Sequence, residues 1–181
     1  MRLRLGGGPG RGITAWSVRD SGSLDLDGLD GLDTRASEAP PGAGAVHPNG
    51  TLSIDHLVVI TPDLDRTAAV LQGAGFALRR LREGDTPGGS RRQAFFRMGE
   101  LILEVVEAPE GTRIAADPSG PARLWGISFL LEDLAAPAAV LGESLGEPRE
   151  AVQPGRQIAT VRSEAGLGTA VAFMTPGPGA V

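Results

Sequence analysis

The feature that most constrains this chain is an internal repeat of two segments, whose starts, Ile54 and Leu124, are 70 residues apart. The first copy reads IDHLVVITPDLDRTAAVLQGAG and ends at Gly75, and the second reads LWGISFLLEDLAAPAAVLGESLG and ends at Gly146. In each copy a short apolar run leads through an acidic-Leu pair into an alanine-rich stretch with apolar residues at helical spacing. Each copy is therefore predicted to form a strand followed by a helix.

Three further strands are predicted after each helix, from apolar and β-branched runs bounded by turn formers. In the first copy they are Phe76–Arg82, Arg91–Met98 and Glu100–Val106, with a turn at Asp85–Ser90. In the second copy they lie near Arg149–Val152, Gln157–Arg162 and Thr169–Met174. A connection rich in turn-forming residues, 107–123, separates the copies. The pattern predicts an α+β protein of two βαβββ modules.

Composition excludes several kinds of protein. The 181 residues are 41% apolar, enough for one sizeable core, and the absence of cysteine excludes disulfides and thiolate chemistry. A net charge of −5 argues against a nucleic-acid partner, which needs clustered positive charge. All 17 basic residues are arginine, so Schiff-base chemistry on lysine is excluded. No apolar run approaches the roughly 18 residues of a membrane span, and no signal peptide is evident, so we expect no membrane partner and a cytoplasmic location.

Residues 1–50 are predicted to be an N-terminal extension, for which two interpretations stay open. Alternating runs at Arg2–Leu5 and Ile13–Val18, separated by GGGPGRG, predict a hairpin. Alternatively, Ile13–Leu32 is a truncated earlier module, because ITAWSV followed by a Leu-Asp stretch echoes ISFLLEDL. Residues 19–50 hold few large apolar groups to offset the entropy of ordering, so most of this stretch is predicted to be linker.

The duplicated strand-helix-three-strand units, the opening IDHLVV and a fourth strand reading ILEVVE resemble the vicinal oxygen chelate (VOC) superfamily. This superfamily includes glyoxalase I, bleomycin-resistance proteins and extradiol dioxygenases, and the chain is most similar to its loosely defined glyoxalase-like group. The resemblance implies a domain at 51–176, with modules at about 52–107 and 124–176. It also implies that the two modules curl around a common cleft in which a small molecule binds.

The resemblance further implies candidate metal ligands, because metal enzymes of this superfamily take a histidine from a module's first strand and a glutamate from its last. His56 and Glu104 match these positions in the first module, as ligands for zinc, nickel, manganese or iron and as catalytic residues. Alternation places each among apolar neighbours on one strand face. A buried carboxylate needs a partner, which for Glu104 would be a metal, an arginine or a proton. The competing interpretation is a strand histidine whose hydrogen bonds are satisfied by Asp55 or Glu104.

The second module does not supply the other half of such a metal site. A shift of 70 residues places Gly126 opposite His56, and the predicted closing strand, Thr169–Met174, contains no carboxylate. A site of two histidines and two glutamates therefore cannot be built from one chain, and a second histidine would have to be His47 from the linker. A symmetric homodimer that brought the first modules of two chains together would supply two copies of His56 and two of Glu104.

Candidate ligand-binding residues come from both modules. The second and third strands of the first module carry six arginines, namely Arg79, Arg80, Arg82, Arg91, Arg92 and Arg97. Alternation pairs Arg80 with Arg82 on one face, and likewise Arg91 with Arg97. Two interpretations stay open for these arginines. They lie on a solvated sheet edge and their charges protect that edge, or they bind an anionic group of the ligand, with Arg91 and Arg97 contributing to this site. In the second module, Gly126 is expected to leave room in the cleft where a histidine would stand, with Ser128 beside it.

Three functional hypotheses follow, and whether the chain is an enzyme stays open. The first is a metal-free binder of bleomycin-resistance type, whose negative charge modestly favours a cationic guest. The alternative is a lyase or isomerase, metal-dependent or metal-free, that uses His56 with Glu104 as general base. A dioxygenase is less favoured. The third is a structural or interaction role with a vestigial cleft.

Overall fold

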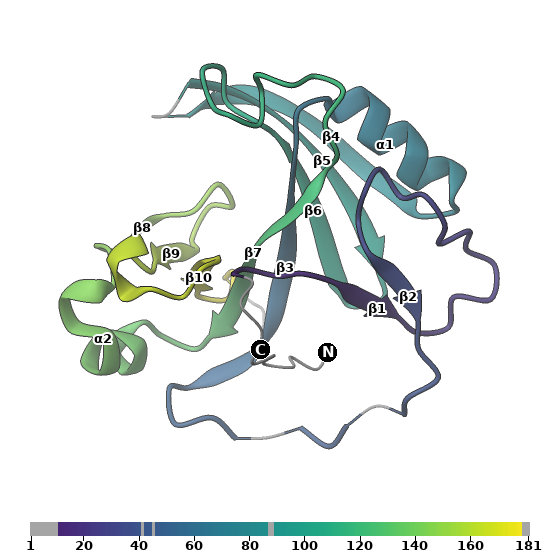
Figure 1. The fold of residues 1–181 in the computed structure, drawn as a ribbon. Coiled ribbons are helices and arrows are strands. Elements are labelled where there is room, and N and C mark those ends of the chain that lie inside the picture. Colours follow the sequence, from purple (N-terminus) through teal and green to yellow (C-terminus); the bar gives the residue numbers. More distant parts are fainter. Residues whose placement is uncertain (1–10, 41, 45, 87–88, 179–181) are drawn as a thin grey trace. The chain divides into compact units, whose positions relative to one another are not determined.

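The computed structural model describes residues 11–40, 42–44, 46–86 and 89–178 (Figure 1). Its contacts divide the chain into two compact units. Unit 1 takes in Pro41–His56 and Gly126–Val181, and unit 2 takes in Ile13–Pro40 and Leu57–Trp125. None of the described helices is long and apolar enough to cross a membrane.

The first module has the predicted order of strand, helix and three strands. Its elements are β3 (Thr51–Thr61), α1 (Leu64–Gly73), β4 (Ala77–Thr86), β5 (Gly89–Met98) and β6 (Leu101–Glu107). In the sheet they run β4-β5-β6-β3, so the first strand of the module lies next to its fourth. The strands β4 and β5 extend into the turn predicted at Asp85–Ser90, of which residues 87 and 88 lie outside the described residues.

Helix α1 forms where capping and periodicity agree, and it covers one face of β4, β5 and β6 (Figure 1). The Asp63 carboxylate caps its start by accepting the backbone N–H of Arg66 at 2.9 Å. Its buried residues recur at helical spacing: Leu64, Thr67, Ala68 and Leu71. They face a sheet surface whose side chains have no exposed area: Ala94, Phe96, Leu103 and Val105.

The N-terminal segment of unit 2 is more ordered than its composition predicted. Strand β1 (Trp16–Val18) lies within the predicted run and pairs in parallel with β2 (Thr34–Ala36). The other half of the predicted hairpin, Arg2–Leu5, lies outside the described residues. Between the strands, Leu29 and Leu32 are 1% and 5% exposed. Within the stretch predicted to be linker, these two leucines supply apolar burial that composition alone did not reveal.

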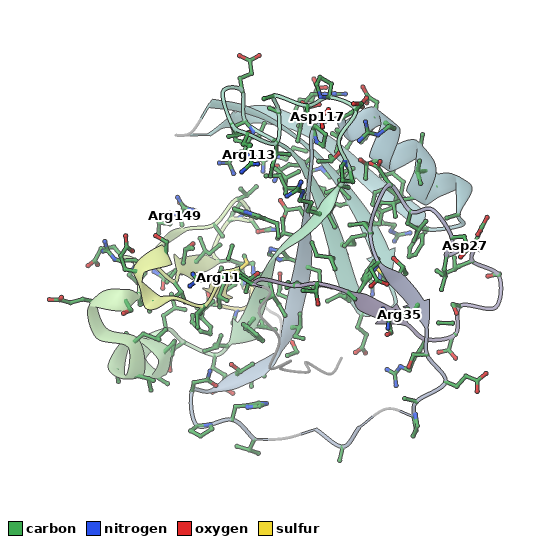
Figure 2. All side chains as sticks on the ribbon, viewed as in Figure 1. Arg11, Asp27, Arg35, Arg113, Asp117 and Arg149 are labelled. Carbon is green, nitrogen blue, oxygen red and sulfur yellow. The ribbon has the colours of Figure 1, made fainter. Side chains whose placement is uncertain are left out.

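Asp30 links this segment to α1 and to the connection between the two modules. Its carboxylate accepts the Nε of Arg66 at 3.0 Å and the hydroxyl of Thr67, and its carbonyl accepts the N–H of Ala122 at 2.8 Å. Arg66 also donates to the carbonyl of Pro118 at 2.6 Å. Figure 2 shows the labelled Asp117 of this connection beside the start of α1. These hydrogen bonds thus connect residues of unit 2 that are far apart in the sequence.

The second module repeats the same order with shorter elements. They are β7 (Arg123–Leu131), α2 (Ala135–Leu141), β8 (Arg149–Glu150), β9 (Gln157–Thr160) and β10 (Ala170–Met174). The strand order is β7-β10-β9-β8, again with the first strand beside the fourth, and β7 pairs with β10 in parallel. Helix α2 is short because Gly142, at φ +52°, ends it in the left-handed region. The predicted duplication is therefore present.

Candidate functional site

The sheet of unit 2 has two chemically different faces. On the face covered by α1, Ala94 and Phe96 of β5 are fully buried, and Arg92 of the same strand pairs with Asp65 of the helix at 2.8 Å. Side chains alternate along a strand, so the intervening residues lie on the opposite face. These are Arg91, Gln93, Phe95 and Arg97.

Cross-strand register completes this second face. The opposed pairs are Arg80–Phe95, Arg82–Gln93 and Gly84–Arg91 between β4 and β5, and Phe95–Glu104 between β5 and β6. Directly opposed residues of antiparallel strands share a face. We call this surface the arginine face and define it by Arg80, Arg82, Arg91, Gln93, Phe95 and Glu104. Sequence alternation identified the pairs of arginines, and the register places them on one surface with Glu104.

Glu104 is half-buried on the arginine face. Its carboxylate accepts a hydrogen bond from the side-chain amide of Gln93 on the neighbouring strand. A carboxylate oriented by an amide donor can act as a general base toward a ligand on the same face. The sequence analysis did not consider Gln93, although its position two residues after Arg91 placed it on this face.

Gly84 of β4 lies next to the guanidinium group of Arg82 and opposite Arg91 in the strand register. The Nη2 and Nε atoms of Arg82 lie 3.9 and 4.0 Å from the point where a β-carbon of Gly84 would stand. Arg91 lies directly opposite Gly84, and its Nε is buried without a hydrogen-bond partner. Among the described residues, neither arginine forms a salt bridge. Gly84 itself contributes no side chain at this position of β4.

The neighbouring arginines are already paired. Arg97 is exposed, and its Nε donates to the carbonyl of Gly99 at 2.7 Å, in the turn before β6. Arg92 forms ion pairs of 2.8 to 3.1 Å with three carboxylates, those of Asp65, Glu83 and Glu107. Of the two arginines predicted to bind ligand, Arg91 therefore retains an unpaired donor, whereas the described contact of Arg97 is with its own turn.

His56 lies in unit 1, in a cluster with Asp55 and Arg156. Its Nδ1 is 2.8 Å from Oδ2 of Asp55, the partner that the competing interpretation of His56 predicted. The other carboxylate oxygen, Oδ1, accepts Nη2 of Arg156 at 2.5 Å. The three side chains are 14 to 19% exposed. Nothing in the sequence indicated Arg156, which follows a Pro-Gly turn 101 residues after Asp55.

Opposing effects set the ionisation of Asp55. Burial by itself raises the pKa of this carboxyl group, but hydrogen bonds from His56 and Arg156, and the charges of both, lower it. The net result is a pKa below the ordinary value of 3.8. Asp55 is therefore ionised at neutral pH.

Gly126 and Ser128 lie on β7 in unit 1, opposite Ala170 and Ala172 of β10. A β-carbon at Gly126 would stand 3.0 Å from the carbonyl oxygen of Ala170 and 3.1 Å from its β-carbon. The β-carbon position of Gly126 is therefore crowded by β10, and a ligand-binding role for Gly126 and Ser128 stays a prediction. Ser128 is 1% exposed, and its hydroxyl has no hydrogen-bond partner among the described residues.

The donor set does not fit the divalent metal that the VOC resemblance implies. In the described part of the chain, no group of three or more His, Asp or Glu side chains is arranged to hold a metal ion. The Nδ1 of His56 is engaged by Asp55, and Gly126 has no donor and no space for a larger side chain. His47 is exposed in the turn closed by the N–H of Gly50. A protein site for zinc or iron ordinarily takes three or more protein ligands.

Solved structures share this fold. Methylmalonyl-CoA epimerase from Mycobacterium tuberculosis matches with a TM-score of 0.57 at 17% identity, over 71% of this chain and 91% of that chain. A hypothetical protein from Bacillus halodurans C-125 matches with a TM-score of 0.55 at 19% identity, over 71% and 96%. A variant of the Streptomyces coelicolor methylmalonyl-CoA epimerase, in complex with 2-nitronate-propionyl-CoA, matches with a TM-score of 0.55 at 22% identity, over 72% and 97%. No protein-family model and no curated protein matches the sequence.

These likenesses confirm the fold. The chain has the α+β fold of these structures, with two modules whose strand orders are the same. The fold class predicted from the repeat is confirmed.

Proposed function

We propose that this protein binds a small molecule carrying a carboxylate, phosphate or similar anion, and that the anion is held on the arginine face by Arg82 and Arg91. The observation that carries the proposal is that Arg91, whose Nε is buried and unpaired, lies opposite Gly84 in the strand register, and that the guanidinium group of Arg82 lies beside the same glycine. The VOC fold of the chain supports a role in small-molecule binding. This proposal favours an anionic ligand over the cationic guest that the net charge suggested.

The physical argument concerns the donor and the two like charges. A buried donor without an acceptor costs roughly 1–3 kcal/mol. Two guanidinium groups near one another also repel, and an anion between them replaces repulsion by two charge-assisted interactions. Because the guanidinium group is a planar fork, it can hold a carboxylate or phosphate through two parallel hydrogen bonds.

The test is calorimetric titration of the protein with short dicarboxylic acids, phosphorylated compounds and CoA thioesters, alongside the cationic antibiotic bleomycin. We expect an anionic compound to bind, and Arg91→Gln to weaken that binding by roughly tenfold or more. Arg97→Gln is the matched control, on the same face of the same strand, and should change the affinity by less than about twofold. Binding of bleomycin with no anionic ligand, or equal losses in both variants, would refute the anion site.

A second candidate function is an isomerase that acts on the carbon next to a carbonyl group of an acyl-CoA. It is favoured by the fold shared with methylmalonyl-CoA epimerases and by Glu104, which lies on the same face as the two arginines. In this reaction Glu104 would take a proton from the carbon acid while the arginine face holds an anionic group of the substrate. Gln93 would keep the carboxylate oriented.

The isomerase is tested by incubating the protein with methylmalonyl-CoA in deuterium oxide and following exchange at the α-carbon by NMR. We expect Glu104→Gln to lower the exchange rate by about 10²–10⁴-fold, the range for loss of a general base, while thioester binding persists. Absence of exchange by the wild type would exclude this substrate, and full activity in Glu104→Gln would exclude Glu104 as the base.

A further inference from the structure

The arginine face is not charged over its whole length, because Phe95 lies within it. Phe95 is half-buried, and in the strand register it lies opposite Arg80 of β4 and Glu104 of β6. Ile102 and Val106 stand two residues before and after Glu104, so alternation places them on the same face. We call Phe95, Ile102 and Val106 the apolar strip. Helix α1 covers the opposite face of these strands, so the strip is not packed against it.

The apolar strip and the cationic end of the arginine face are separated along β5. Arg91 precedes Phe95 by four residues, a distance of about 13 Å at the usual rise of a strand. Arg82 stands two residues before Gly84 on β4, and its guanidinium group lies beside that glycine, which is opposite Arg91. The side chain of Arg82 is therefore directed toward the Arg91 end of the face and away from Phe95.

We infer that the ligand of the arginine face is an elongated anion with an apolar segment, and that Phe95 determines the specificity for this segment. The anionic group binds Arg82 and Arg91, and an alkyl or aryl chain of several carbons extends along β5 onto the apolar strip. This inference rests on the proposed anion site and adds the class of ligand. That class is a carboxylate or phosphate joined to an apolar chain, as opposed to a compact ion.

Two different interactions then contribute to affinity. Charge-assisted hydrogen bonds hold the anionic group and depend little on what is attached to it. Burial of the chain is non-directional and grows with the apolar area removed from water, by up to about fourfold in affinity for each methylene group. Arg80 flanks the strip on β4, but its side chain is exposed, so water solvates its charge. Chain length at constant charge therefore isolates the contribution of the strip.

The inference is tested by calorimetric titration with two homologous series, monoalkyl phosphates from methyl to octyl and straight-chain monocarboxylates from acetate to octanoate. In the wild type we expect affinity to rise with chain length, by about two- to fourfold per methylene group. In Phe95→Ala the gain of the octyl compound over the methyl compound should fall by about tenfold or more, while the affinity for the methyl compound changes by less than about twofold.

Leu81→Ala is the matched control, because Leu81 is a 57% exposed apolar residue of β4 that lies opposite Ala94, on the other face of the sheet. It should leave the gain with chain length unchanged. Should Phe95→Ala fail to fold by circular dichroism, Phe95→Leu replaces it, and the same gain should fall by about twofold or more.

The outcomes separate this inference from the anion site on which it rests. A wild-type affinity that does not rise with chain length, a gain unchanged in the folded Phe95 variant, or an equal loss in Leu81→Ala would overturn the apolar segment. In those cases weaker binding of methyl phosphate or acetate by Arg91→Gln would leave the anion site standing. Absence of binding by every member of both series would refute the anion site and this inference together.

Discussion

Adjacent arginines on β5 have opposite surroundings, because one step along a strand changes the face on which a side chain lies. Arg92 reaches three carboxylates on the helix side, whereas Arg91 points to the arginine face with its Nε unpaired. The same residue type at consecutive positions therefore forms an ion-pair network in one case and has a buried, unpaired Nε in the other.

We expect Arg92→Gln to lower the free energy of unfolding by about 1 kcal/mol, a modest figure because this ion-pair network is partly solvent-exposed. The substitution Arg91→Gln should not lower it, because no salt bridge is lost and a buried Nε without a partner is removed. Urea unfolding of both variants measures the two values. A larger loss for Arg91→Gln than for Arg92→Gln would contradict the assigned roles.

The pKa of Asp55 also predicts how stability depends on pH. Burial opposes ionisation, but contacts with His56 and Arg156 bring the folded pKa below the ordinary 3.8, so the unfolded state binds more protons as the pH falls. The contribution of Asp55 is therefore fully present above pH 3.8 and is lost as the pH falls through the lower folded value.

Accordingly, Asp55→Asn should be less stable than wild type by roughly 1–3 kcal/mol at pH 7, the range for a hydrogen bond to a charged group. The difference should shrink in denaturation curves measured below about pH 4. A difference that stayed constant from neutral pH to pH 3 would show that the ionised carboxylate is not its source.

At the scale of elements, the contact between β7 and β10 explains the glycine that replaces the expected histidine. Gly126 allows the two parallel strands to pair where a β-carbon would press on Ala170. We expect Gly126→Ala to destabilise the protein by about 1–3 kcal/mol, the usual cost of overpacking. Gly73→Ala, at an uncrowded helical position, is the control and should be neutral or stabilising. Thermal unfolding compares them, and equal melting temperatures would refute the steric argument.

The N-terminal segment is a second element whose role can be measured. Leu29 is 1% exposed, although it lies in a stretch that composition assigned to linker. We expect Leu29→Ala to cost about 2–5 kcal/mol, as for other buried leucines, and Leu167→Ala, at a residue 53% exposed, to cost far less. Chemical denaturation of the two variants measures both losses in the free energy of unfolding. A negligible loss for Leu29→Ala would mean that the segment adds little to the stability of unit 2.

At the scale of the whole molecule, the incomplete donor set predicts the response to metal removal. Protein purified without chelator should contain far less than stoichiometric zinc, nickel, manganese or iron by elemental analysis, and EDTA should leave its melting temperature unchanged. The variant combining His56→Ala and Glu104→Ala is the control. Near-stoichiometric metal that disappears in this variant would contradict the prediction and point to the metal-dependent enzyme instead.

The repeat was sufficient to predict most of the fold. Strand alternation and helical periodicity are local patterns, so the strands and helices could be located from residues such as Asp63, which caps α1, and the apolar run before it. The N-terminal segment was the exception, since the burial of Leu29 depends on partners that are distant in the chain.

The candidate site could be predicted only where a local pattern carried it. Alternation grouped Arg91 with Arg97, and chain adjacency supplied the contact between Asp55 and His56. The pairing of Arg156 with Asp55 spans 101 residues, and the crowding at Gly126 depends on Ala170 of another strand. The sequence by itself determined the two-module fold, because the periodicity of apolar residues and the duplicated segments can be recognised from consecutive residues of the chain. Only the tertiary structure decided which donors are paired, which remain unpaired and which positions have space, because those properties arise from contacts between residues far apart in the chain.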